Sequence, residues 1–80
     1  MTKDDAYKRL AVILEQDFQV PPHKIADGTT LRKDLGLDSL ALTDLALMVQ
    51  NDFGLPSESD ELMGINTVGA LAEFVAVHAP

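Results

Sequence analysis

Apolar residues recur at the three- and four-residue spacing of an α-helix in several stretches of this chain, and no stretch alternates apolar and polar residues as a β-strand does. The first stretch follows Thr2, which has Asp5 three residues later, a start that is similar to a capping box. Its apolar positions are Leu10, Ile13, Leu14 and Phe18. We expect a helix over residues 3–18, ended before Pro21 and Pro22 because proline lacks an N–H group to donate.

A second helix is expected to begin at Asp38 and Ser39, two residue types that favour helix N-termini, and to stop at Gly54 and Pro56. Its apolar positions are Leu40, Leu45, Val49 and Phe53. A short helical piece is expected over residues 59–63, closed by Gly64.

The final helix is expected to take Asn66 as its N-cap residue and to fray at Pro80. Its buried positions are predicted to be Val68, Leu71, Ala72 and Val75. Between the first two helices lies a long connection, residues 19–38, and loops of that length are uncommon in small domains unless they are packed down or functional. Four apolar residues are its expected anchors: Ile25, Leu31, Leu35 and Leu37. The pattern therefore predicts an all-α fold of one domain, residues 1–80, with three main helices, one short helix and a long first loop.

Composition narrows the function classes. The chain has 80 residues, of which 46% are apolar, and this favours a folded domain with one compact core and no deep catalytic cleft. It has no cysteine, which excludes disulfides, Cys nucleophiles and the usual zinc fingers and makes a cytoplasmic location the simplest expectation. The first residues are a mixed charged stretch and do not resemble a signal peptide. No apolar run in the chain is long enough to span a membrane.

Charge is distributed unevenly along the chain. All six Lys and Arg residues lie in the first 33 positions, against five acids, whereas the remainder has eight acids and no Lys or Arg. A surface of this kind repels nucleic acid and anionic lipid and attracts basic partners. Alternatively, the acidic residues only keep the domain soluble.

One local motif carries candidate chemistry: Asp34-Leu35-Gly36-Leu37-Asp38-Ser39-Leu40. It predicts a turn that delivers a serine to the N-terminus of an amphipathic helix. Such a serine is most often just a helix cap. The same place also suits a modified hydroxyl, because unpaired N–H groups and the helix dipole favour an attached phosphate. No His or Lys lies nearby in sequence to activate the serine as a nucleophile, which counts against a small hydrolase.

The motif resembles the signature of the acyl carrier protein family. The match continues through Asp52-Phe53-Gly54-Leu55-Pro56 and through Ile65-Asn66-Thr67-Val68 at the start of the last helix, and it extends over nearly the whole chain. The resemblance implies a four-helix acyl-carrier bundle, and a carrier rather than an enzyme, with no catalytic residue and no metal site. It implies that Ser39 receives 4'-phosphopantetheine from coenzyme A and that Asp38 is recognised by the modifying transferase and by partners.

Several partners follow from the resemblance: a phosphopantetheinyl transferase, and a ketosynthase, an acyltransferase or an acyl-activating ligase. The helix after Ser39 becomes the recognition helix, and its expected partner-binding residues are Leu40, Ala41, Leu42, Asp44, Leu47 and Met48. The outward positions expected on this helix are Ala41, Leu42, Asp44, Leu47, Met48, Gln50, Asn51 and Asp52. Only two of these carry a charge, Asp44 and Asp52, whereas the family's primary-metabolism members are crowded with acids here.

The sparse charge favours a carrier of polyketide or related specialised biosynthesis. We also expect a monomer, and the Met1 start with the complete set of expected helices favours a freestanding chain. Three alternatives stay open: a fatty acid synthase carrier, an aminoacyl or peptidyl carrier, and a helical interaction module without a prosthetic group. Asp38 argues against the peptidyl carriers, because they usually have a histidine at that position.

Overall fold

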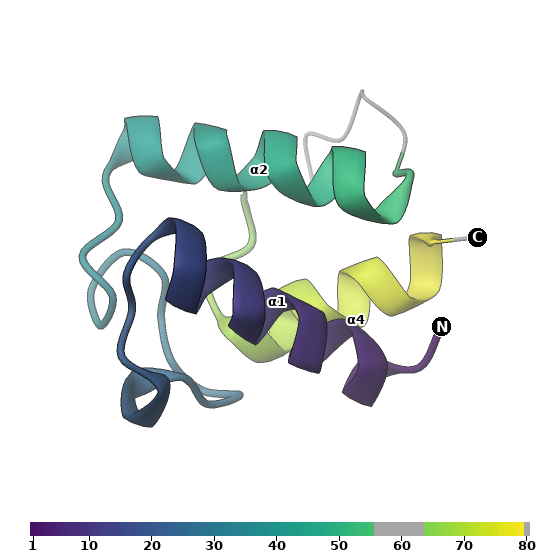
Figure 1. The fold of residues 1–80 in the computed structure, drawn as a ribbon, viewed down its shortest axis with the longest axis horizontal. Helices are drawn as coiled ribbons and strands as arrows, with labels where there is room; N and C mark the ends of the chain where they lie inside the picture. Colours follow the sequence, from purple (N-terminus) through teal and green to yellow (C-terminus); the bar gives the residue numbers. More distant parts are fainter. Residues whose placement is uncertain (56–63, 80) are drawn as a thin grey trace.

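The computed structural model describes residues 1–55 and 64–79, and the elements found there are helical (Figure 1). They are α1 (Lys3–Asp17), a 3-10 turn η1 (Pro22–Lys24), α2 (Ser39–Phe53) and α4 (Val68–His78). The described residues contain no strand, only an isolated bridge between Thr30 and Thr67. The helix expected at residues 59–63 and the fraying expected at Pro80 lie outside the described residues. None of the described helices has the length and apolar content to cross a membrane.

The start of α1 follows the sequence prediction closely. The Thr2 hydroxyl accepts a hydrogen bond of 3.1 Å from the Asp5 backbone N–H, which satisfies one of the unpaired donors of the first turn. The helix ends at Asp17, with Phe18 as its C-cap residue, one position before the predicted end. Its buried face consists of Ala6, Leu10, Ile13 and Leu14.

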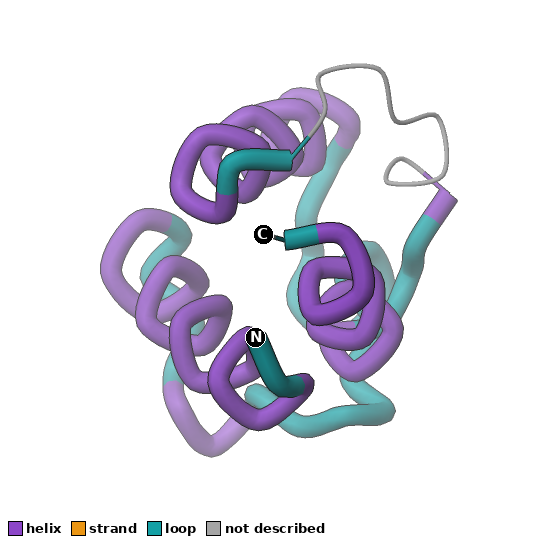
Figure 2. Tube along the Cα trace, turned by 90° about the vertical axis from the view of Figure 1, so that its right-hand side faces the viewer, coloured by secondary structure: helices purple, strands orange, loops and turns teal. Residues whose placement is uncertain are grey.

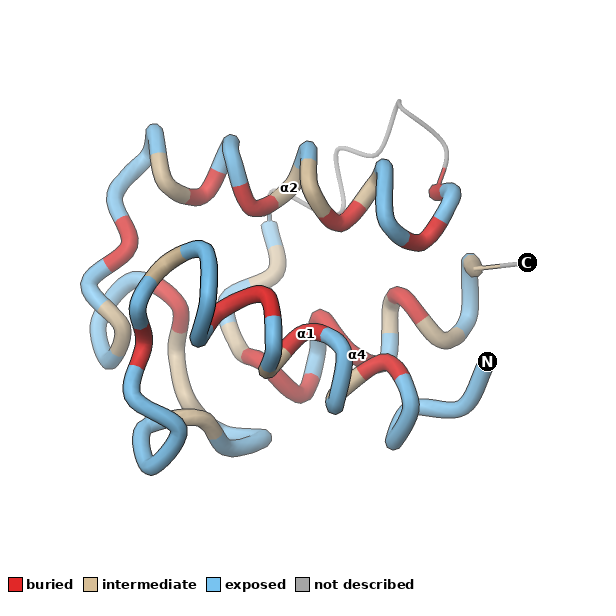
Figure 3. The backbone as a smooth tube through the Cα atoms, viewed as in Figure 1, coloured by how far each residue is buried: buried red, intermediate tan, exposed pale blue. Residues whose placement is uncertain are grey.

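Both ends of α2 lie where the sequence places them. Gly54 closes the helix with φ 66°, in the left-handed conformation that favours glycine after a helix. One predicted apolar position behaves differently, because Leu40 is 77% exposed. The buried residues of α2 are Leu42, Leu45, Val49 and Phe53, on the side that faces α1 and α4 (Figure 3).

The predicted N-cap of the last helix is wrong by one residue. Thr67, and not Asn66, caps α4: its hydroxyl accepts a 3.1 Å hydrogen bond from the Ala70 backbone N–H. The Asn66 carbonyl instead accepts a 2.7 Å bond from the Leu31 backbone N–H. A neighbour in the tertiary structure therefore decides which of the two polar residues caps the helix.

The three helices surround a common apolar interior (Figure 2), and the long first loop closes one side of it. Leu31 and Leu37 of this loop are buried and Ile25 and Leu35 are partly buried, so the predicted anchors are confirmed. Backbone hydrogen bonds join the loop to the start of α4, from Val68 N–H to the Thr29 carbonyl at 3.0 Å and from Gly69 N–H to the Asp27 carbonyl at 2.9 Å.

Gly69 is needed at this junction, because a Cβ at that position would lie 2.8 Å from the Asp27 carbonyl oxygen. The long first loop thus lies against α4 at a distance that only glycine permits. This contact holds in place the loop that leads into α2.

Candidate functional site

The turn before α2 is held by a reciprocal pair of hydrogen bonds. The Thr30 backbone N–H donates to the Asp34 carboxylate at 2.9 Å, and the Asp34 backbone N–H donates to the Thr30 hydroxyl at 2.9 Å. The backbone bond from Thr30, with help from the Thr30 hydroxyl and the charge of Lys33, lowers the pKa of Asp34. Asp34 therefore stays ionised at neutral pH and keeps this turn closed.

Gly36 then redirects the chain toward the helix. Its φ is +70°, a conformation that side-chain-bearing residues rarely adopt. The next residue, Leu37, is buried, and its N–H donates to the Leu31 carbonyl at 3.1 Å. The motif is thus anchored by a buried leucine on the residue just before Asp38.

Asp38, and not Ser39, is the N-cap residue of α2. The Asp38 carboxylate accepts a 2.8 Å hydrogen bond from the Ala41 backbone N–H. Ser39 is the first helical residue and is exposed. Among the described residues no hydrogen bond engages its hydroxyl. The interpretation of Ser39 as a mere cap is therefore wrong, because the neighbouring aspartate already fills that role.

This geometry fits an attached phosphodiester. Residues at the first helical position lie beside backbone N–H groups that have no partner within the helix, and the helix dipole adds a partial positive charge there. Ser39 itself is exposed to solvent. His78 is engaged elsewhere, stacked on Phe74 at 4.2 Å, and His23 lies in η1.

The expected partner-binding residues divide into three groups. Leu40, Asp44 and Leu47 are exposed, and Ala41 and Met48 are half-buried. Leu42 contradicts the prediction, because it is only 8% exposed and belongs to the core. Leu42 shares a helix face with Leu45 and Val49, three and seven residues later, and the long loop and α4 cover that face. Gln50, also expected to face outward, is half-buried.

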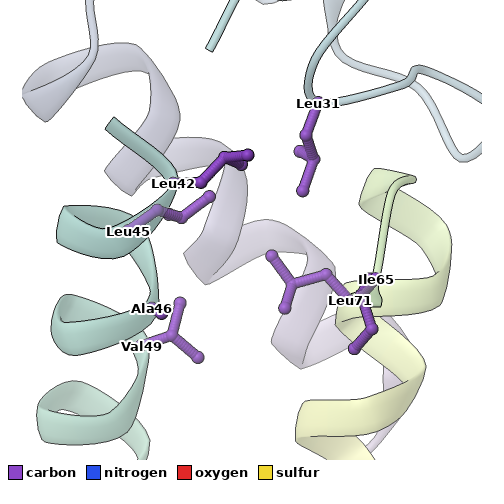
Figure 4. Close-up of a pocket in the computed structure, with 7 residues that line it drawn as sticks. All are labelled: Leu31, Leu42, Leu45, Ala46, Val49, Ile65 and Leu71. Carbon is purple, nitrogen blue, oxygen red and sulfur yellow. The ribbon is translucent and has the colours of Figure 1, made fainter. Parts of the chain in front are cut away.

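Leu42 lines a small internal cavity with a free volume of about 20 Å³ between α2, the long loop and α4. In Figure 4 the α2 side chains point toward Leu31 and Leu71 on the opposite wall. The cavity is lined by Leu31, Leu42, Leu45, Ala46, Val49, Ile65 and Leu71. The sequence pattern gave these residues as apolar but did not reveal the cavity, since its walls come from three separate segments.

Comparison with known proteins finds a matching family and several similar chains. The family described as "Phosphopantetheine attachment site" matches residues 8–75. An acyl carrier protein of Saccharopolyspora erythraea is 33% identical over 74 residues, which cover 92% of this chain and 78% of that protein. An acyl carrier protein of Lactobacillus acidophilus is 26% identical over 78 residues, 98% of each chain. A meromycolate extension acyl carrier protein of Mycolicibacterium smegmatis is 24% identical over 74 residues, 92% of this chain and 75% of its own.

Among solved structures, the acyl carrier protein of Enterococcus faecalis matches with a TM-score of 0.80 and 23% sequence identity, and the match covers 99% of this chain and 100% of that one. This likeness confirms the predicted all-α acyl-carrier fold.

Proposed function

Since this chain belongs to the acyl carrier protein family, whose shared domain is a phosphopantetheine attachment site, we propose that Ser39 is the residue that carries the 4'-phosphopantetheine arm. The protein is a carrier and not an enzyme. The placement of Ser39 supports it above all: Ser39 is exposed, it is the first residue of α2, and no hydrogen bond among the described residues engages its hydroxyl, since Asp38 caps the helix.

The arm supplies a terminal thiol that holds an acyl group as a thioester. The chain's own residues attach and orient the arm. Ser39 provides the ester oxygen, and the N-terminus of α2 favours the negative charge of the phosphodiester. Asp38 fixes the first turn through its bond to the Ala41 N–H and adds a carboxylate that a basic transferase surface would recognise.

Shielding of the cargo requires a change in the core. A free volume of about 20 Å³ holds little more than one water molecule, which needs roughly 10–15 Å³ of such space. An acyl chain enters only if Leu42 and Val49 of α2 move away from Leu31 and Leu71. We expect the cavity to widen in this way when cargo is loaded.

For the pathway, we propose polyketide or related specialised biosynthesis. The support is the outer surface of α2, where Leu40 and Leu47 are 77% and 53% exposed and acids are few. Apolar contacts would then contribute more to docking than salt bridges do. A fatty acid synthase carrier is the alternative, and it is excluded if a fatty acid ketosynthase accepts the loaded protein slowly and with little dependence on salt.

Attachment is tested by intact mass after co-expression with a phosphopantetheinyl transferase. The parent chain and matched Ser57→Ala and Ser59→Ala controls should gain the arm, and Ser39→Ala should not. A Ser39→Ala protein that still gains the arm would falsify this assignment, and a parent that never gains it would favour the interaction module without a prosthetic group.

The two roles of Asp38 are separated by two substitutions. Asp38→Asn keeps a good N-cap and loses the charge, whereas Asp38→Ala loses both at a cost of about 1 kcal/mol of stability. If the charge is what the transferase recognises, both variants should slow arm transfer equally. Slowing by Asp38→Ala alone would show that only the cap matters.

A further inference from the structure

α1 and α2 run in opposite directions (Figure 1), and two hollows lie between them. The first has a free volume of about 320 Å³ and is lined by Lys8, Arg9, Val12, Ile13 and Asp52. The second has a free volume of about 350 Å³ and is lined by Asp17, Phe18, Asp44, Leu47, Met48 and Asn51. We call the two together the α1–α2 groove. From Lys8 to Phe18 it is roughly 15 Å long at 1.5 Å rise per residue, the length of about three helical turns.

Several apolar side chains along the groove are only partly covered. Val12 is 51% exposed and Leu47 53% exposed, and Phe18 and Met48 are half-buried. A groove between two helices, with bare apolar side chains along it, suits the apolar face of a third helix whose side chains are spaced at i, i+3 or i+4, and i+7.

The two ends of the groove differ in charge. Asp17 and Asp44 lie in one hollow with no cation beside them, while the other holds two cations and one acid. Arg9 is occupied, with its guanidinium 4.6 Å from the centre of the Phe53 ring and a bond to the Asp52 carbonyl. In the part of the chain that the structure describes, the one ion pair is Lys3–Asp27, so Lys8, Asp17 and Asp44 have no charged partner there.

We propose that the α1–α2 groove is a docking surface for an amphipathic helix of a partner enzyme. The helix carries basic side chains over Asp17 and Asp44, an acidic side chain over Lys8, and apolar side chains between them. This inference rests on the proposed carrier function. Leu47 lies about 12 Å along the helix axis from Ser39, so a helix in the groove brings the enzyme close to the arm.

Two other occupants fit less well. A second copy of this chain carries the same net charge of -7 and is repelled as a whole. The protein's own acyl cargo is uncharged along its chain and gains nothing from the opposite charges at the two ends. A partner helix with both charge signs uses the ends and the apolar middle together.

The probe is a synthetic 14-residue helical peptide with leucines at i, i+3, i+4 and i+7, lysines at its labelled end and glutamate at the other. It is titrated into the full-length, isotope-labelled protein, and a nitroxide on the lysine end reports its direction by paramagnetic relaxation. The amides of Val12, Phe18, Leu47 and Met48 should shift, and relaxation should be strongest near Asp17. A peptide with glutamate at both ends should bind at least tenfold more weakly.

Charge reversal supplies the matched control. Asp17→Lys should weaken binding at least fivefold, whereas Glu73→Lys, the same charge change at an exposed residue of α4, should change it less than twofold. Adding Lys8→Glu to Asp17→Lys should restore affinity and move the relaxation effect to the Lys8 end. Equal effects of the Asp17 and Glu73 substitutions, or shifts confined to Leu40 and the internal cavity, overturn the proposal.

Two further outcomes also overturn it. A dimer in sedimentation that Asp17→Lys dissolves assigns the groove to a second copy, and shifts at Val12 and Phe18 on acyl loading assign it to the cargo. Peptide binding needs no arm, so Ser39→Ala should bind the peptide as the parent does. A failed peptide titration with successful arm attachment therefore rejects the groove and leaves the carrier function standing.

Discussion

The two sides of the molecule are held together differently. The long loop is joined to the start of α4 by backbone hydrogen bonds at Leu31, Val68 and Gly69, and its leucines are buried. Across the α1–α2 groove no hydrogen bond joins backbone to backbone among the described residues, and the helices meet through side chains such as Arg9 on Phe53. The tight side fixes the turn that presents Ser39, whereas the open side leaves apolar and charged groups for a partner.

The largest expected effect comes from truncating the buried side. Leu71→Ala should lower the free energy of unfolding by about 3 kcal/mol, because Leu71 is fully packed and its loss enlarges the internal cavity. The matched change across the groove, Leu47→Ala, should cost less than about 1 kcal/mol because that side chain is 53% exposed. Urea denaturation measures both, and equal losses would remove the distinction between the two sides.

A smaller effect is expected where the loop meets α4. Gly69→Ala should destabilise the protein by about 2 kcal/mol, because the new Cβ would lie 2.8 Å from a backbone oxygen that has little freedom to move. Gly28→Ala is the control, since no atom lies within 4 Å of the corresponding Cβ. The melting temperatures of the two variants test this prediction. Equal melting temperatures for Gly69→Ala and Gly28→Ala would show that the loop shifts at little cost in stability.

On the open side, Arg9 is the side chain that links α1 to the end of α2. Arg9→Ala should cost about 1 kcal/mol through loss of the cation–π contact with Phe53 and of the bond to the Asp52 carbonyl. Lys8→Ala, one residue away, should have no measurable effect on stability. Hydrogen exchange at the C-terminal end of α2 should rise in the first variant only, and an equal rise in both would argue against a specific link.

The smallest effect concerns the pH dependence of the turn before α2. The Thr30 hydrogen bonds lower the pKa of Asp34 in the folded protein, so its contribution to stability is fully present above the unfolded pKa of about 3.9 and is lost as pH falls through the lower folded pKa. Asp34→Asn should therefore be less stable than the parent at neutral pH, and the gap should close in acid. A gap that stays constant down to pH 2 would contradict this assignment.

Local signals in the sequence were enough to locate the helices. Thr2 and Gly54 mark the start of α1 and the end of α2 correctly, because a cap hydrogen bond or a left-handed residue involves only neighbours in the chain. Where two polar residues compete for a cap, the local signal fails: Asp38 rather than Ser39 caps α2, and Thr67 rather than Asn66 caps α4.

The sequence alone also determined the family, through the motif around Ser39, and with it the prosthetic group. It did not determine which side of α2 is buried, because apolar residues occur all around this helix and its own periodicity has no unique solution. Leu42 lies inside and Leu40 and Leu47 outside only because the long loop and α4 meet the helix on one side. The internal cavity, the close approach at Gly69 and the α1–α2 groove are likewise properties of the tertiary structure, since each is formed by segments that are far apart in the chain.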